Sequence, residues 1–402
     1  MNILQLCNKV PFPPKDGGCI AMNNLTHGLI DEGHHVKVIA VNTKKHFIDI
    51  AKLPSDYRSE TGIEAVFIDT EVKIADALFN LFSTKSYNIE RFYSKAFEKK
   101  LIEILLAENF DIIQLEGLYV SMYVDIIRKY TKAKIVLRAH NVEYKIWEHA
   151  AQLAKKPLKK AYLMLLAARL KNYELNSLSS YDAIATITQK DEKCFAVAGF
   201  QKSMETFPFG IDLINKNENN LPQEEYPSLF HIGAMDWQPN IEGVNWFLNN
   251  VWDKLHAKHP QLKLYLAGRN ISDELKQLHK PNVINVGEVE NAAAFIQSKG
   301  VMIVPLLSGS GMRVKIIEGL ALGKTIVTTS IGVEGIDCEN NINCIIADDA
   351  RGFSEAISKC ISDKVFYNEI GKNAKILATQ RYNNADICKR LTKFYQKVVT
   401  DI

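Results

Sequence analysis

The sequence has few of the features that mark secreted, zinc-binding or membrane-spanning proteins. Its seven cysteines are odd in number, scattered and never spaced as Cys-x-x-Cys, which argues against disulfides and a zinc site. No stretch approaches the ~20 apolar residues that a spanning helix needs. The start at Met1 is apolar too briefly for a signal peptide and has no basic lead-in. We therefore expect a cytoplasmic protein with reduced thiols that does not span a membrane.

Motifs for several chemistries are missing as well. The sequence contains no Asp-x-Asp, no Walker loop and no Gly-x-Ser-x-Gly elbow. With 49 Lys+Arg against 46 Asp+Glu, the net charge of +3 gives no general attraction to nucleic acid. We expect no nucleic-acid partner, no metal and no cofactor. The charge of any bound phosphate would then be met by protein groups.

The pattern that is present indicates an α/β fold with two parallel sheets. Short runs rich in Val and Ile alternate with segments of helical period, as in sheets covered by helices on both faces. We expect a first series of strands at 2–6, 35–41, 65–68, 112–114, 134–138 and 183–186. A second series is expected at 228–232, 262–267, 283–286, 301–304, 325–328 and 344–346. The polar stretch 215–223 reads as a linker, and we place the domain boundary near residue 210, giving domains 1–209 and 210–381.

Two loops of the first half follow expected strands and carry groups suited to a ligand. Gly17 and Gly18 precede a helix expected over 20–32, and such a helix N-terminus favours a phosphate. His140 follows the strand 134–138 and is placed to donate a hydrogen bond to a sugar hydroxyl or a phosphate oxygen. A glycine turn without a ligand and a structural histidine are the alternatives at these two positions.

The segment 305–319 is the most informative part of the sequence. After a buried strand, a loop with Gly309 and Gly311 opens a helix whose first turn carries Arg313 and Lys315, which suits a diphosphate. Glu318 follows and is suited to accept two hydrogen bonds from the vicinal hydroxyls of a ribose. The alternative is a capped helix with solvated basic residues.

These residues together resemble the GT-B-fold retaining glycosyltransferases of family four. The resemblance covers essentially the whole chain and rests on Gly17-Gly18, His140, Phe209–Asp212, Leu266–Arg269 and the block from Gly311 to Glu334. It implies two Rossmann-like domains facing each other across a deep cleft, with a C-terminal helix, 382–402, that packs on the first domain. In this family two acids stand at the donor site. Glu318 corresponds to the second, and a glycine-rich loop that includes Gly311 stands in place of the first.

The resemblance also implies a reaction and a set of roles. A sugar would pass from a nucleotide-diphosphate donor to an acceptor hydroxyl of a glycan or lipid-linked substrate, with retention at the anomeric carbon and without a metal. His140, Arg313 and Lys315 would be the catalytic residues. The donor would be bound by the residues Gly17, Gly18, Gly233, Arg269, Gly309, Gly311 and Glu318. Basic donor contacts that the family carries after the first strand of the second domain are missing at Gly233, which places more of the diphosphate charge on Arg313 and Lys315.

Other functions fit the same scaffold. A nucleotide-sugar epimerase shares the fold, and a degenerate donor site would give a protein that binds a nucleotide sugar without turnover. The segment 151–173 reads as a basic amphipathic helix, which suits contact with an anionic membrane and a lipid-linked acceptor. The alternative is a helix packed on one side and solvated on the other.

Overall fold

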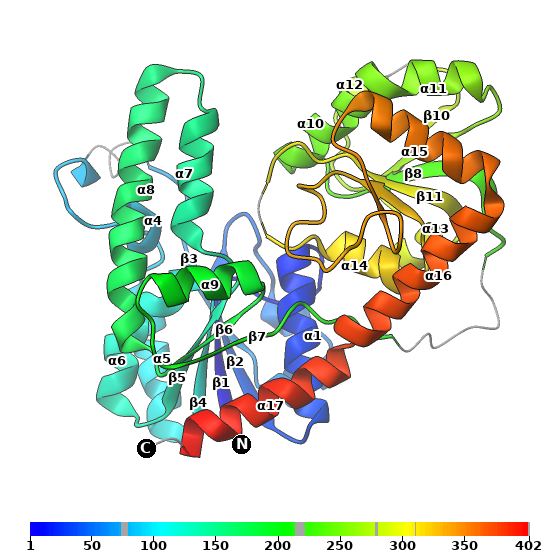
Figure 1. The fold of residues 1–402 in the computed structure, drawn as a ribbon. Helices are drawn as coiled ribbons and strands as arrows, with labels where there is room; N and C mark the ends of the chain where they lie inside the picture. The colour runs from blue at the N-terminus through cyan, green and yellow to red at the C-terminus, as the bar shows by residue number, and fades with distance from the viewer. Residues whose placement is uncertain (74–78, 214–221, 278–279, 310, 401–402) are drawn as a thin grey trace. The chain divides into compact units, whose positions relative to one another are not determined.

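The computed structural model divides the chain into two compact α/β units. One comprises Met1–Phe209 with Ala385–Ile402, and the other Gly210–Asn384 (Figure 1). The structure describes residues 1–73, 79–213, 222–277, 280–309 and 311–400. Most of the linker expected at 215–223 lies outside these residues. The expectation of an α/β fold with two parallel sheets is confirmed.

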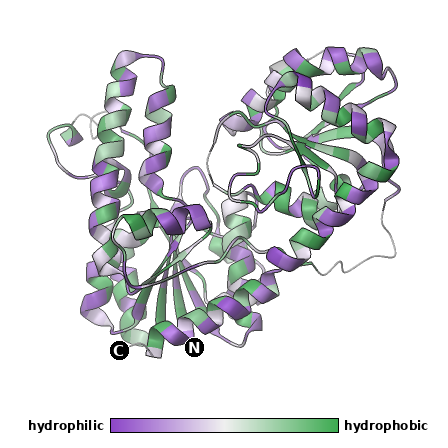
Figure 2. Ribbon diagram, in the orientation of Figure 1, coloured by the Kyte–Doolittle hydropathy of each residue, from purple (hydrophilic) through white to green (hydrophobic). Residues whose placement is uncertain are grey.

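The first unit is built on a parallel sheet in the order β3-β2-β1-β4-β5-β6-β7. Its strands are β1 (Asn2–Cys7), β2 (His35–Thr43), β3 (Glu64–Ile68), β4 (Ile112–Glu116), β5 (Lys134–Ala139), β6 (Ala183–Thr186) and β7 (Ser203–Thr206). In β1 the side chains of Ile3, Leu4 and Leu6 are fully buried, because helices cover both faces of the sheet. Figure 2 shows the hydrophobic residues gathered along these strands.

The helices of the first unit form a layer on each face of its sheet. The elements between strands are α1 (Gly17–Asp31), η1 (Ile50–Lys52), α2 (Ser55–Thr61), α4 (Tyr87–Glu90), α5 (Lys95–Ala107), η2 (Leu118–Tyr123), α6 (Val124–Tyr130), α7 (Glu143–Leu153), α8 (Pro157–Ser177), η3 (Leu178–Ser180) and α9 (Gln189–Val197). The C-terminal helix α17 (Asn384–Thr400) joins α1 on one face, where Leu391 and Tyr395 are fully buried in the same core as Met22 and Leu29.

The segment expected as one helix over 151–173 is two helices. Helix α7 ends at Leu153 and α8 begins at Pro157, which occupies the first turn of α8. Proline lacks a backbone N–H and disfavours helical geometry in the residue before it, so it begins a helix and does not continue one. The basic stretch therefore covers the end of α7, the connection and α8.

The second unit has a six-stranded parallel sheet in the order β10-β9-β8-β11-β12-β13. Its strands are β8 (Glu225–Ile232), β9 (Leu264–Ala267), β10 (Val283–Gly287), β11 (Lys299–Val304), β12 (Ile326–Thr328) and β13 (Ile345–Ile346). Around it lie α10 (Gln238–Phe247), the π-helical η5 (Leu248–Trp252), α11 (Asp253–Lys258), α12 (Asp273–Lys276), α13 (Ala292–Gln297), α14 (Val314–Ala321), α15 (Ala350–Ser362) and α16 (Lys364–Arg381). Trp252, Phe247 and Phe353 are buried in its core.

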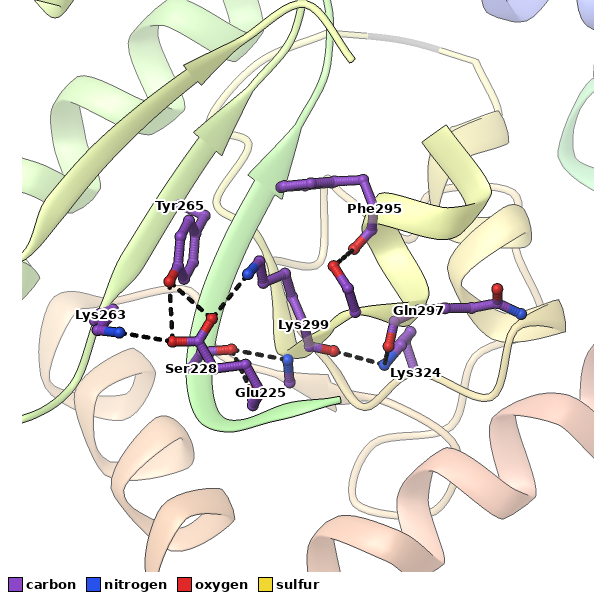
Figure 3. A network of polar contacts seen from close by, with 10 residues as sticks. Glu225, Ser228, Lys263, Tyr265, Phe295, Gln297, Lys299 and Lys324 are labelled. Carbon is purple, nitrogen blue, oxygen red and sulfur yellow. Dashed lines mark hydrogen bonds and ion pairs between the residues drawn. The ribbon is translucent and has the colours of Figure 1, made fainter. Parts of the chain in front are cut away.

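A network of hydrogen bonds connects the amino ends of three strands in the second unit (Figure 3). The carboxylate of Glu225 on β8 accepts hydrogen bonds from Lys263 at 3.0 Å, from the Tyr265 hydroxyl at 2.7 Å and from Lys299 at 2.8 Å. Although burial alone would raise it, these donors lower the pKa of Glu225 to about 2. This network fixes the edge of the sheet opposite to the one that carries the candidate site.

Candidate functional site

The strand ends of the second unit bring together most of the residues expected to bind the donor. Gly233 follows β8, Gly268 and Arg269 follow β9, and the loop before α14 follows β11. Strands β9, β8 and β11 are parallel neighbours, so their carboxyl ends and the loops after them share one edge. Ligands of open parallel sheets bind at such an edge.

Two glycines allow the first two of these loops to touch. Gly268 has φ of +147°, and a Cβ atom there would lie 1.8 Å from the carbonyl oxygen of Gly233. At Gly233 a Cβ atom would lie 2.7 Å from Nδ2 of Asn240 and 2.9 Å from Nζ of Lys315. Glycine at position 233 thus leaves room for the lysine to reach the end of β8. This explains why a residue without a side chain stands at this expected donor position.

Lys315 lies in the first turn of α14, and its Nζ lies at the end of β8. Its Nζ donates to Oδ1 of Asn240 at 2.7 Å and to the carbonyl oxygen of Ile232 at 3.3 Å, and lies 3.5 Å from Nε2 of His231. All three partners are uncharged acceptors, because His231 Nδ1 bonds to the carbonyl oxygen of Ile303 and burial holds the histidine pKa well below its ordinary value. Burial, and secondarily the charge of Arg313, lower the pKa of Lys315 to about 7.

Arg313 is the N-cap residue of α14 and is almost completely buried. Its guanidinium carbon lies 5.5 Å from the ring centroid of Trp237, and Nη1 donates to the carbonyl oxygen of Gly311. Burial lowers the pKa of Arg313 to about 10, although the charge of Glu334 acts in the opposite direction. Gly309 and Gly311 have φ of +113° and +78°, so this loop reaches the arginine through backbone geometry that favours glycine.

Glu318 lies on α14 one turn beyond Lys315. Burial raises the pKa of its carboxyl to about 7, and no donor among the described residues forms a hydrogen bond with it. A desolvated carboxylate without protein donors is stabilised when the hydroxyl groups of a ligand donate hydrogen bonds to it. Ser310, in the loop before it, lies outside the described residues.

Arg269 shares the edge but makes a different contribution. Its carbonyl oxygen accepts the amide hydrogen of Met235 at 2.9 Å, which joins the loops after β8 and β9. Its side-chain Nε is buried and has no hydrogen-bond partner among the described residues. Arg313, Lys315, Glu318, Gly233, Gly309, Gly311 and Arg269 therefore belong to one edge of one unit.

The remaining expected residues belong to the first unit. Gly17 and Gly18 open helix α1, whose N-cap residue Asp16 accepts the amide hydrogen of Cys19 at 2.9 Å and an ion pair from Lys9 at 2.6 Å. Although burial alone would raise it, these contacts lower the pKa of Asp16 to about 2. The N-terminus of α1 therefore already carries a fixed carboxylate.

His140 follows β5 and is held by a chain of buried polar groups. Its Nε2 lies 2.6 Å from Oε2 of Glu116, at the end of the adjacent strand β4. Gln114 donates to the other oxygen of Glu116, and the hydroxyl of Tyr395 on α17 donates to Gln114 at 2.6 Å. A carboxylate on one ring nitrogen fixes the orientation and tautomer of an imidazole, and leaves Nδ1 for other contacts.

Several of these partners were not expected from the sequence. They are His231, Trp237 and Asn240 in the second unit and Gln114, Glu116 and Tyr395 in the first. The signal that was available is position, because His231 and Glu116 lie at or next to strand ends.

The described residues hold no group of three or more His, Cys, Asp or Glu side chains arranged to bind a metal ion. Within the described part of the chain, none of the helices combines the length and apolar character needed to cross a membrane.

Comparison with known proteins gives a family match for part of the chain and a relative of similar length. Residues 226–363, which include the whole edge described for the second unit, match the family of group 1 glycosyl transferases. An uncharacterized 44.6 kDa protein in the cps region of Klebsiella pneumoniae is 24% identical over 97% of this chain and 99% of its own length.

Two solved structures show the same fold. Sucrose-phosphate synthase from Thermosynechococcus elongatus superposes with a TM-score of 0.70 and 15% identity, covering 99% of each chain. HepE of Anabaena, solved with UDP, superposes with a TM-score of 0.67 and 14% identity, covering 99% of this chain and all of its own. The chain thus has the GT-B fold, and the similarity to group 1 glycosyl transferases covers residues 226–363.

Proposed function

We propose that this protein transfers a sugar from a nucleotide-diphosphate sugar to an acceptor hydroxyl. The observation that carries the proposal is the pair of cations at the start of α14, the buried Arg313 and the half-buried Lys315, within the segment that matches group 1 glycosyl transferases. The hydrogen-bond acceptors of Lys315 are all neutral, so its charge is not compensated at short range. A diphosphate supplies the missing charge.

The start of α14 adds to the attraction for an anion. The first amides of a helix lack partners within it, and the helix dipole favours negative charge there. As the glycosidic bond breaks, negative charge develops on the leaving diphosphate. Fixed cations and amides at that position stabilise the transition state more than the bound substrate.

Glu318 is proposed to bind the ribose of the donor. Its carboxylate accepts hydrogen bonds from two vicinal hydroxyls, and these donors replace the water that burial removes. Because HepE was solved with UDP and with UDP-glucose, a uridine nucleotide is the first donor to test.

The proposed reaction retains configuration at the anomeric carbon and needs no divalent metal. The bond between the anomeric carbon and the diphosphate breaks, the acceptor oxygen bonds to that carbon, and its proton passes to the leaving phosphate. Arg313 and Lys315 provide the positive charge that a metal ion would otherwise provide beside the diphosphate. His140, held by Glu116 at 2.6 Å, contacts the donor sugar.

The proposed acceptor is a growing glycan of a polysaccharide such as capsule, since the relative from Klebsiella pneumoniae lies in a cps region. The free cysteines fit action in the cytoplasm.

A lipid-linked acceptor would suit the basic stretch 151–173, where the sequence has no acid and Leu158 is 88% exposed. Its exposed cations are Lys155, Lys156, Lys159 and Lys160. Peripheral contact with an anionic membrane through this surface is part of the proposal.

The test is a thermal-shift screen of the purified protein against UDP, GDP and their sugars, with and without EDTA, followed by mass spectrometry of the products. We expect one nucleotide class to stabilise the protein in EDTA, and the effect to be lost in Glu318→Gln. Glu369→Gln, an exposed acid on α16, is the matched control.

The screen also separates the alternatives. A nucleotide sugar of altered configuration would identify an epimerase. Binding without any product across an acceptor panel would identify a binding protein. If no nucleotide binds, or binding requires a divalent metal, the proposed donor site is wrong.

A further inference from the structure

A cavity lies in the first unit, whose sheet does not carry the proposed donor site. It has a volume of about 740 Å³ and lies over the carboxyl edge of β3, β2, β1 and β4, which are neighbours in the sheet. Residues directly after two of these strands line it, Asn8 after β1 and Lys44 after β2, and Thr70 lies two positions after the end of β3. The position is the one where open parallel sheets bind ligands.

The lining of this cavity has an excess of positive charge. The described residues that line it include the basic residues Lys9, Lys44, Lys45, His46 and Arg91, against one carboxylate, that of Glu71. Lys44 pairs with Glu71 at 3.1 Å, and Lys9 with Asp16 at 2.6 Å. Lys45 is exposed, and neither Lys45 nor Arg91 has an ion pair among the described residues. Arg91 donates a hydrogen bond to the backbone oxygen of Thr70 at 3.5 Å, and its guanidinium carbon lies 5.6 Å from the ring centroid of Phe92. Two cations are therefore left for a ligand.

Buried polar atoms and an aromatic wall complete the cavity. Oδ1 of Asn8 and Nε of Arg91 are buried without a hydrogen-bond partner among the described residues. Such atoms cost free energy unless a ligand or water meets them. Phe92 stacks on Tyr119 with ring centroids 4.9 Å apart, and the hydroxyl of Tyr119 is fixed by Glu143 at 2.8 Å. This rigid pair offers an apolar face beside the cations.

We propose that this cavity binds the acceptor and that the acceptor carries an anionic group, a phosphate or a carboxylate, which pairs with Arg91 and Lys45. The inference rests on the proposed transferase function, because it assigns the second substrate of that reaction. A neutral glycan would gain nothing from the two cations. A guanidinium, in contrast, binds a carboxylate or phosphate through two parallel hydrogen bonds.

The test is calorimetric titration with three probes: farnesyl diphosphate, glucuronic acid and neutral glucose. We expect at least one anionic probe to bind and glucose not to bind. Binding of farnesyl diphosphate alone assigns the charge to a lipid-linked diphosphate, and binding of glucuronic acid alone assigns it to an acidic sugar. Either result, or both together, supports the proposal.

Variants locate the binding. Arg91→Gln is expected to weaken the anionic probe about tenfold, or about 1.4 kcal/mol, and Lys45→Ala about threefold. Lys132→Ala is the matched control, since it removes an exposed lysine just before β5, at the amino edge of the same sheet. Equal weakening by Lys132→Ala would show general charge attraction and overturn the site.

The donor site is measured in parallel, so the two proposals fail separately. Stabilisation by UDP should persist in Arg91→Gln and be lost in Glu318→Gln. If UDP binds the wild-type protein but neither anionic probe does, the anionic acceptor is wrong and the transferase proposal stands. If no nucleotide binds, the transferase proposal fails, and the assignment of this cavity to an acceptor fails with it.

Discussion

The affinity for a nucleotide sugar should have a bell-shaped dependence on pH with its maximum near pH 7. Burial lowers the pKa of Lys315 to about 7 and raises that of Glu318 to about 7. The diphosphate binds the protonated lysine, and the ribose hydroxyls favour the ionised carboxylate. Each pH unit away from the maximum therefore lowers the fraction of protein in the binding-competent protonation state, and with it the affinity, by up to about tenfold.

Two variants separate the limbs of this curve. Lys315→Met should remove the decline above pH 7, and Glu318→Gln should remove the decline below it, while each lowers the affinity at the maximum. UDP-glucose is the suitable ligand because each of its phosphates carries one ester and one anhydride bond, which leaves only strongly acidic groups that do not titrate in this range. His231 does not interfere, since burial holds its pKa well below the ordinary value and it stays neutral. Titration calorimetry from pH 5 to 9 measures the effect.

Lys315→Met should also stabilise the second unit. The lysine pKa of about 7 against an ordinary 10.5 corresponds to about 5 kcal/mol of unfavourable burial, at about 1.4 kcal/mol for each pKa unit. Because the pKa is lowered on folding, this cost is fully present below pH 7 and disappears as the pH rises to 10.5. Loss of the hydrogen bond to Asn240 costs about 1–3 kcal/mol. We expect a net gain of about 2 kcal/mol at pH 7. An affinity independent of pH, or a destabilised Lys315→Met, would refute this account of the lysine.

Three further variants test other parts of the structure. Glu225→Gln should cost about 1 kcal/mol in urea unfolding at pH 7, since its carboxylate is about a third exposed. Its pKa of about 2 means that the difference from wild type shrinks as the pH falls from 4.5. Gly268→Ala should cost about 3 kcal/mol or more, seen as faster proteolysis of the second unit, because its Cβ atom would overlap the Gly233 carbonyl. Glu116→Gln should lower turnover about tenfold without changing UDP stabilisation, because it weakens the bond that orients His140.

The sheets were predictable because their strands are buried on both faces. The three apolar residues in the middle of 134–138 predict a buried strand, and this segment forms β5 (Lys134–Ala139). The edge strand β7, Ser203–Thr206, was missed because its four residues are only half-buried and carry no apolar run. The break between α7 and α8 at Pro157 does not follow from the pattern of apolar residues, because the helical periodicity of 151–173 continues across the proline.

The candidate site was predictable where it is contiguous in sequence. Arg313, Lys315 and Glu318 lie on one helix entry, so spacing alone brings them together. The partners that decide their chemistry are distant in sequence: Asn240 bonds to Lys315 across 75 residues, and Tyr395 bonds to Gln114 across 281. No local pattern encodes such pairs, because they depend on the order of strands in the sheet.

The two helix N-termini singled out in the sequence differ in what they offer a phosphate. Helix α1 is capped by the carboxylate of Asp16, whose pKa of about 2 keeps it charged, and Lys9 neutralises that charge. Helix α14 begins with the buried Arg313 and the half-buried Lys315, and the hydrogen-bond acceptors of Lys315 are neutral. A diphosphate at α1 would meet a carboxylate that occupies the amide of Cys19, whereas at α14 it compensates existing positive charge. The proposed donor diphosphate therefore fits α14 better than α1, and Gly18 leaves room for Lys9, whose Nζ would lie 3.0 Å from a Cβ atom on Gly18.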